Sequence, residues 1–145
     1  MYCNGVQSYR KTNITTSDPL RLIILCYEGV IDNLKLAKKK LEEKDYEKKS
    51  RALIKARDII EELMCSLDFD KGGEIANNLE SLYNYMFRKI LQGDVNKDIG
   101  AIDEVIGICG DLLSAWQEVA SKPHSKVQHA PGSLYHEKRL CILDI

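Results

Sequence analysis

Apolar residues recur at intervals of three and four in four successive segments, and this spacing restricts the possible fold more than any other feature. Such spacing gathers the apolar side chains on one face of an α-helix, which has to be buried against other elements. Loops of roughly two to six residues join the segments, and connections this short make consecutive helices antiparallel. The sequence therefore predicts an all-α protein, an antiparallel up-and-down four-helix bundle within residues 18–121.

Aspartates and glycines indicate where these helices begin and end. Asp18 can cap the first helix, and Pro19 suits its first position, where no backbone N–H is needed. Gly72 and Gly73 can take a positive φ without a Cβ clash, so the second helix is expected to end there and the third to begin. Gly93 is expected to end the third helix. The predicted helices cover about residues 19–41, 46–71, 74–92 and 96–120.

The two ends of the chain lack a helical period. Residues 1–17 are expected to form an N-terminal arm or cap, and residues 122–145 a flexible tail. The first turns of the first helix are apolar almost all round, because Leu22 and Leu25 lie beside the core face. Either another part of the same chain, such as the arm, or a partner protein could cover this second side. The sequence leaves both possibilities open.

Composition excludes several classes of function. The formal net charge of −1 predicts no nucleic-acid partner. The most apolar run is six residues long, against about 20 for a membrane-spanning helix, and no signal peptide is visible at the N-terminus, so no membrane insertion is expected. The five cysteines are scattered and include no Cys-x-x-Cys pair, which is typical of free thiols. The protein is therefore expected to be cytoplasmic.

Histidines are absent from the four predicted helices and occur only in the tail, as His124, His129 and His136. A di-iron bundle needs inward-facing Glu-x-x-His pairs, and a phosphotransfer bundle needs a histidine on a helix. The tail spacings do not match a zinc motif, and no nucleophile–base pair or phosphate-binding loop is found. The sequence therefore predicts no enzyme, cofactor or metal, and it leaves a surface for another protein as the functional element.

The candidates for such a surface are the second side of the first helix, the Tyr83 and Tyr85 side of the third, and the apolar residues of the N-terminal arm. Tyr85 lies about 100° around the third helix from the core face, where it can be either a half-buried boundary residue or a contact for a partner. The expected core face consists of Ile75, Ala76, Leu79, Leu82, Tyr83, Met86 and Ile90.

Several short motifs, taken in their order and spacing, resemble a known family over about residues 9–116. They are Tyr9 with Thr16–Leu20, Leu25–Gly29, Ala56–Ile60, Leu67–Phe69, Gly72–Ala76, Leu79 to Met86, Asp103–Ile106 and Ala115–Trp116. In these the chain resembles FliS, the export chaperone of bacterial flagellin. The resemblance implies a four-helix bundle with an N-terminal cap, and a chaperone without enzymatic activity or cofactor. It also implies binding of the disordered C-terminal region of flagellin, which blocks premature polymerisation and supports type III flagellar export.

The resemblance and the apolar pattern together suggest which residues contact the client. Tyr27 and Tyr83 also lie on core faces, so core packing is the alternative for both. The arm is hypothesised to cap the client groove until flagellin displaces it. The candidate partner-binding residues are Tyr9, Ile14, Leu22, Leu25, Tyr27, Leu79, Tyr83, Tyr85 and Met86.

Other readings stay open beside this one. The alternative function is a generic helical-bundle adaptor or regulator with a different protein client, and an unexpected enzyme comes third. Components of the flagellar export apparatus are further candidate partners. The tail lies outside the resemblance, and Gly100, Gly107 and Gly110 interrupt the fourth helix. These glycines either permit close helix approach or make that helix less stable, and they leave self-association possible.

Overall fold

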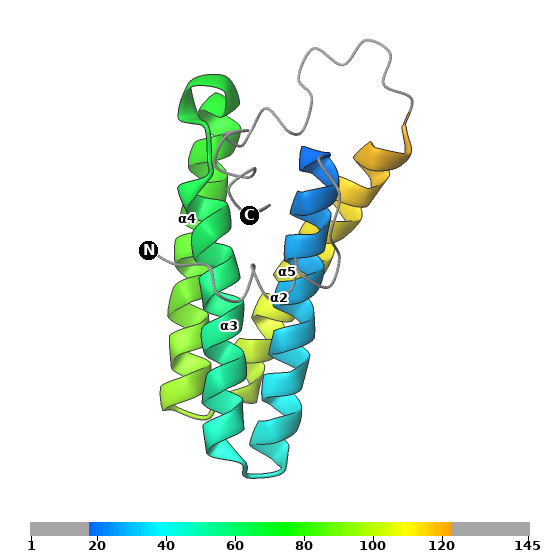
Figure 1. Cartoon of the computed structure of the whole chain (residues 1–145). Coiled ribbons are helices and arrows are strands. Elements are labelled where there is room, and N and C mark those ends of the chain that lie inside the picture. The colour runs from blue at the N-terminus through cyan, green and yellow to red at the C-terminus, as the bar shows by residue number, and fades with distance from the viewer. Residues whose placement is uncertain (1–17, 123–145) are drawn as a thin grey trace.

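The computed structural model describes residues 18–122, which form four α-helices (Figure 1). Their bounds are Pro19–Glu42 for α2, Tyr46–Cys65 for α3, Phe69–Val95 for α4 and Ile99–Ser121 for α5. The predicted all-α class is confirmed. The predicted arm, residues 1–17, and the predicted tail beyond Lys122 lie outside the described residues. No helix within residues 18–122 is long and apolar enough to cross a membrane.

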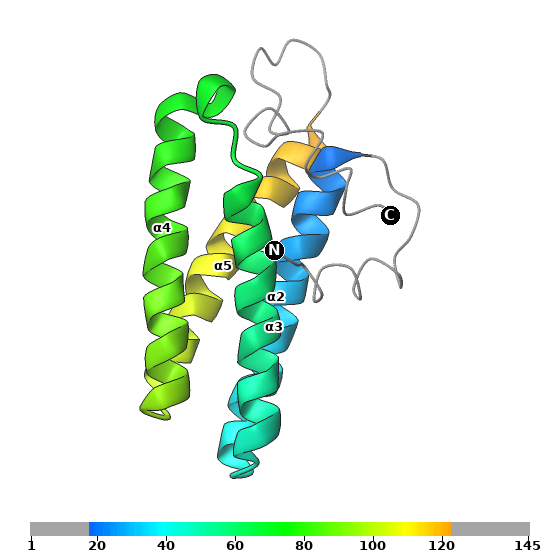
Figure 2. The ribbon, with the colours of Figure 1, turned by 60° about the vertical axis from the view of Figure 1, so that its left-hand side comes forward.

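The helices are arranged in a ring in which each one runs opposite to its neighbours. α2 packs against α3 and α5, and α4 packs against the same two helices from the other side. The chain runs down along α2, up along α3, down along α4 and up along α5 in Figure 1. A second view shows α3 and α4 side by side along most of their length (Figure 2). The predicted antiparallel up-and-down bundle is confirmed.

An aspartate precedes each helix, and its side chain accepts hydrogen bonds from backbone N–H groups of the first turn. These groups have no partner within the helix, so each cap contributes about 1 kcal/mol. Asp18 was predicted as a cap from the sequence. The bonds are Leu20 N to Asp18 at 3.1 Å, Lys48 N to Asp45 at 3.2 Å, Lys71 N to Asp68 at 3.0 Å and Ala101 N to Asp98 at 3.2 Å.

The break between the second and third helices was placed wrongly at the glycine pair. α3 already ends at Cys65, and α4 begins at Phe69 because the Asp68 carboxylate accepts the N–H groups of residues 70 and 71. Gly73 does take a positive φ, of 51°, as the sequence predicted, but it interrupts the helical geometry inside α4. The Asp68 cap, five residues before Gly73, therefore starts the helix, and Gly73 then changes its direction.

Gly93 does not end the third helix, which continues to Val95. Gly93 is buried, and a Cβ atom added there would lie 2.7 Å from Cγ1 of Ile102 on α5. Its role is to let α4 and α5 approach each other. The turn that follows contains Lys97 with a φ of 54°, and α5 begins at Ile99 after the Asp98 cap.

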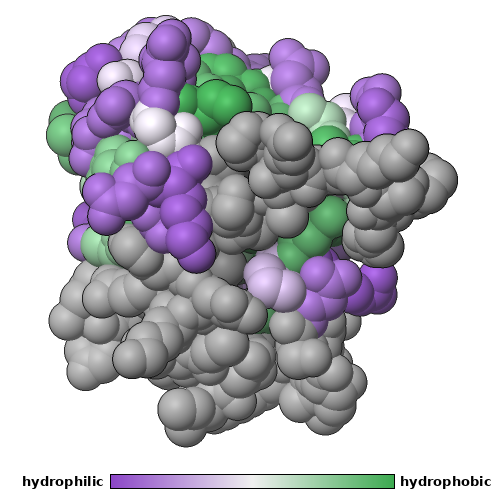
Figure 3. All heavy atoms as spheres, turned by 90° about the horizontal axis from the view of Figure 1, so that it is seen from above, coloured by the Kyte–Doolittle hydropathy of each residue, from purple (hydrophilic) through white to green (hydrophobic). Residues whose placement is uncertain are grey.

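The core is built from the apolar faces of all four helices. The expected face of α4 is buried at positions 76, 79, 83, 86 and 90, but Ile75 is 58% exposed, so its placement in the core was wrong. The buried positions are spaced alternately by three and four, and Ile75 lies about 100° around the helix from Ala76. Seen from the end of the bundle where α2 begins, the described residues form apolar patches that are bordered by polar residues (Figure 3).

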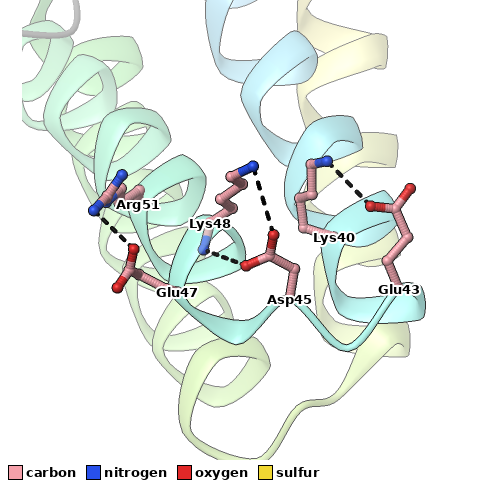
Figure 4. A network of polar contacts seen from close by, with 6 residues as sticks. All are labelled: Lys40, Glu43, Asp45, Glu47, Lys48 and Arg51. Carbon is pink, nitrogen blue, oxygen red and sulfur yellow. Dashed lines mark hydrogen bonds and ion pairs between the residues drawn. The ribbon is translucent and has the colours of Figure 1, made fainter.

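Charged side chains surround the turn between α2 and α3. Lys40 pairs with Glu43 at 3.1 Å, Lys48 with Asp45 at 3.8 Å, and Arg51 with Glu47 at 2.8 Å (Figure 4). All three pairs are local in sequence and largely exposed. Such pairs contribute roughly 0–1 kcal/mol each.

Candidate partner-binding site

Seven of the nine candidate residues lie on α2 and α4, and Tyr9 and Ile14 lie outside the described residues. The structure brings two of the seven into contact across the bundle. The phenol oxygens of Tyr27 on α2 and Tyr83 on α4 are 2.5 Å apart and share a hydrogen bond. Both side chains are at most 1% exposed. Burial of both rings favours core packing, which the sequence had left as the alternative to partner contact.

Three further candidates are also buried in this structure. Leu22 on α2 is 3% exposed, and Leu79 and Met86 on α4 are 7% and 0% exposed. Met86 lies beside Cys109 of α5, with 3.6 Å between the two sulfur atoms. A partner would touch these side chains only after the groups that cover them had moved.

Leu25 and Tyr85 are the two candidates that keep accessible surface, and both are half-buried. Leu25 lies in the first turns of α2, where Ile23, Cys26 and Tyr27 are buried around it. Leu22 and Cys26, which lie beside the core face, are buried as well as Ile23 and Tyr27 on it, so the start of α2 is covered on more than one side.

Tyr85 takes part in a charged cluster that joins α4 to α5. Its hydroxyl donates a hydrogen bond to the Glu104 carboxylate, and Lys89 lies 3.5 Å from the same carboxylate. The side chains of Arg88 and Lys89 lie over the Tyr85 ring, each 5.6 Å from its centre. The hydrogen bond raises the pKa of the Tyr85 phenol and lowers the pKa of the Glu104 carboxyl. Tyr85 is thus held half-buried at the surface by charged side chains of α4 and α5.

An apolar surface between α3 and α4 was not predicted from the sequence. Ile54 on α3 is 44% exposed, and Leu91 and Val95 on α4 are 62% and 68% exposed. Ile54 and Leu91 line a groove together with the half-buried Phe87. A signal was present, because Phe87, Leu91 and Val95 recur at intervals of four beside the core face of α4.

The buried thiols of Cys26 and Cys109 have low reactivity. Burial raises the pKa of Cys109 to about 12, and burial with the nearby Glu62 carboxylate raises the pKa of Cys26 to about 12. Thiols with such pKa values stay protonated at neutral pH and are poor nucleophiles. Within residues 18–122, no group of three or more His, Cys, Asp or Glu side chains is placed to hold a metal ion. The fold and its surface together define the class of this protein. It is a four-helix bundle that exposes apolar side chains between two of its helices.

Comparisons with known proteins identify the family. The profile described as "Flagellar protein FliS" matches residues 2–123. The flagellar secretion chaperone FliS of Salmonella typhimurium is 36% identical over 124 residues, which cover 82% of this chain and 92% of that protein. The FliS chaperone of Bacillus subtilis is 30% identical over 131 residues, which cover 90% of this chain and 96% of that protein. The FliS chaperone of Vibrio cholerae is 30% identical over 125 residues, which cover 83% of this chain and 92% of that protein.

The chain therefore belongs to the FliS family of flagellar secretion chaperones. Members of this family are chaperones and not enzymes, and flagellar proteins are their class of partner. The resemblance inferred from the short motifs is confirmed.

Proposed function

We propose that this protein is a cytoplasmic export chaperone for flagellin. It binds the C-terminal region of flagellin, prevents premature polymerisation and supports export through the flagellar type III apparatus. The observation that carries the proposal is the match of residues 2–123 to the FliS family, together with relatives named flagellar secretion chaperones.

The physical basis of this function is a rigid bundle that offers apolar surface to a client without stable structure of its own. Ordering such a client costs on the order of 2–5 kcal/mol, so affinity has to come from wide apolar burial. Leu25 and Tyr85 can take part directly, since both are half-buried. The buried candidates Leu22, Leu79 and Met86 take part if binding displaces the groups that cover them.

Calorimetric titration with a synthetic peptide tests the proposal. The peptide consists of the last 40 residues, roughly, of flagellin from the same organism, and a scrambled peptide of equal composition is the control. Binding coupled to ordering gives favourable enthalpy, opposing entropy and a negative heat-capacity change. Absence of heat with the flagellin peptide, while circular dichroism shows an intact bundle, would refute the proposal.

A further inference from the structure

The groove between α3 and α4 offers an accessible guanidinium group at one end and an accessible carboxylate at the other. Asp94 lies level with Ser50, whose hydroxyl donates a hydrogen bond to its Oδ1 at 2.7 Å. Arg57 is seven residues further along α3, which at 1.5 Å per residue places it about 11 Å from the level of Asp94. Each group has one close counter-charge, Asp58 at 3.5 Å from Arg57 and Lys49 at 2.6 Å from Asp94, yet the two side chains are still 52% and 30% exposed.

The chain beyond Lys122 contains a run of apolar residues between opposite charges. Arg139 directly precedes the run, and Asp144 directly follows it. The profile of the FliS family matches only as far as residue 123, so the run lies outside the family match. Five positions separate Arg139 from Asp144, which corresponds to about 8 Å in a helix and about 17 Å in an extended chain. The separation of about 11 Å between the charged ends of the groove lies within that range. The run consists of Leu140, Cys141, Ile142 and Leu143.

The chain after α5 is long enough to bring this run to the groove. Met86 of α4 lies level with Cys109 of α5, since their sulfur atoms are 3.6 Å apart. α4 and α5 run in opposite directions, so Lys122 lies thirteen residues above this level in Figure 1 and Asp94 eight residues below it. The axial distance is therefore about 32 Å, and passing around α4 adds about one helix diameter of 10 Å. Residues 123–139 span up to about 56 Å when extended, so the chain can pass along the groove and turn back into it.

We propose that residues 140–143 cover the α3–α4 groove of the same molecule. The run lies against Ile54 and Leu91, which are 44% and 62% exposed in the described part of the chain. Arg139 pairs with Asp94, and Asp144 pairs with Arg57, so the run points back toward the end of the bundle where α5 ends.

Tethering makes this contact stronger than its small area suggests. A tether of this length gives an effective concentration in the millimolar range, roughly, so a modest apolar contact is enough to keep the groove covered. The run is thus an internal cover for apolar side chains that other proteins could contact. Anything that binds in the groove has to displace it.

Disulfide trapping through the native Cys141 tests the proposal in the full-length protein. Leu91→Cys is introduced together with Cys3→Ser and Cys65→Ser, so that the other native thiols are buried in the core. The protein is oxidised with diamide at micromolar concentration, and the disulfides are identified by mass spectrometry of proteolytic peptides. The expected result is at least ten times more disulfide between position 91 and Cys141 than in a control variant, within single molecules and with an intact bundle by circular dichroism.

The matched control is Leu36→Cys in the same background, because Leu36 on α2 is also exposed, at 44%, and lies outside the groove. Lys38 pairs with Asp103 of α5 at 2.9 Å, so Leu36 lies about 26 Å below Lys122 along the bundle, within reach of Cys141. Equal trapping at positions 36 and 91, or no trapping at position 91 in a folded protein, would overturn the proposal. A disulfide that joins two molecules would overturn it in favour of a second copy of the chain in the groove. No flagellin is used, so these outcomes leave the proposed function untouched.

A charge reversal tests the direction of the run. Arg57→Glu should lower the yield of the disulfide at position 91 about threefold, because Asp144 then faces a like charge. Adding Asp144→Lys should restore the yield, since opposite charges face each other again. An unchanged yield in Arg57→Glu, or no restoration in the double variant, would overturn the assigned direction.

Discussion

The two phenol groups that meet at the centre of the bundle come from helices on opposite sides of the ring. Tyr27 and Tyr83 place two hydroxyls in an apolar core, where a polar group without a partner destabilises the folded state by roughly 1–3 kcal/mol. Their mutual hydrogen bond, at 2.5 Å, supplies a partner to each. The pair therefore links α2 to α4 directly and requires these two helices to keep one register.

Tyr83→Phe should lower the free energy of unfolding by about 1 kcal/mol, since it removes the hydrogen bond and keeps the ring. Urea denaturation followed by circular dichroism measures the change. Tyr46→Phe is the matched control, because Tyr46 is 41% exposed and its hydroxyl is not in the core. Equal stability of Tyr83→Phe and the wild type would show that the hydroxyl pair contributes nothing net.

Tyr85→Ala should weaken binding of the flagellin peptide while barely changing the melting temperature. The side chain is half-buried and its partners Arg88 and Glu104 are exposed, so its contribution to folding is small. Tyr85→Phe separates the two possible roles, because it keeps the ring and loses the hydrogen bond to Glu104. A large loss of stability together with intact binding would remove Tyr85 from the set of candidate contacts.

At the scale of the helices, one ion pair connects the start of α3 to the end of α4. Lys49 is buried, at 3% exposure, and donates to both the side chain and the backbone carbonyl of Asp94. Partial burial disfavours the Asp94 anion, but the hydrogen bonds from Lys49 and Ser50 outweigh it and hold the pKa of Asp94 below its ordinary value. The folded state therefore favours the anion more than the unfolded chain does.

Asp94→Asn should lower the free energy of unfolding at pH 7 by about 2 kcal/mol, because Lys49 loses its charged partner. A depressed pKa contributes stability that is present above the unfolded pKa of about 4 and is lost as the pH falls through the folded pKa. The difference between wild type and variant should therefore shrink below pH 4, roughly. Urea denaturation across a pH series measures it, and the control is Asp103→Asn, which removes the exposed ion pair between Asp103 and Lys38. A difference independent of pH would contradict this account.

The glycines of α5 and Gly93 of α4 have opposite roles. No neighbour lies within 4 Å of a Cβ added at Gly107 or Gly110, and at Gly100 the nearest atom is the Asp98 cap at 3.2 Å. Of the two readings left open by the sequence, the structure supports the less stable helix and not close approach. Close approach occurs instead at Gly93, where Ile102 lies in the path of a side chain.

Gly107→Ala should raise the free energy of unfolding by up to about 1 kcal/mol, since alanine is the better helix former and space is open. Gly93→Ala gains the same propensity, but its Cβ would clash with buried Ile102, and overpacking of this kind destabilises by roughly 1–3 kcal/mol. We therefore expect opposite signs for the two substitutions in thermal denaturation. Stabilisation by both would mean that Ile102 adjusts without penalty.

For the whole molecule, the periodicity of the sequence was sufficient to predict the bundle, because burying four apolar stripes leaves few arrangements. Boundaries were less accurate where an aspartate cap and a glycine competed, as at Asp68 and Gly73. The α3–α4 groove was missed because Ile54 and Leu91 lie outside the core faces on which a periodicity argument depends. Which candidate residues stay exposed also depended on packing between helices, which the pattern of a single helix does not contain.

The order of the helices around the bundle affects how soon after synthesis the chain is folded. Three of its four most extensive helix–helix contacts join elements that are consecutive in the chain, and folds with such local contacts reach the native state in roughly microseconds to milliseconds. A ribosome adds about 5–20 residues per second. The finished chain should therefore fold in less time than the ribosome needs to add one residue, so translation and not folding sets how soon the chaperone can meet a newly made client.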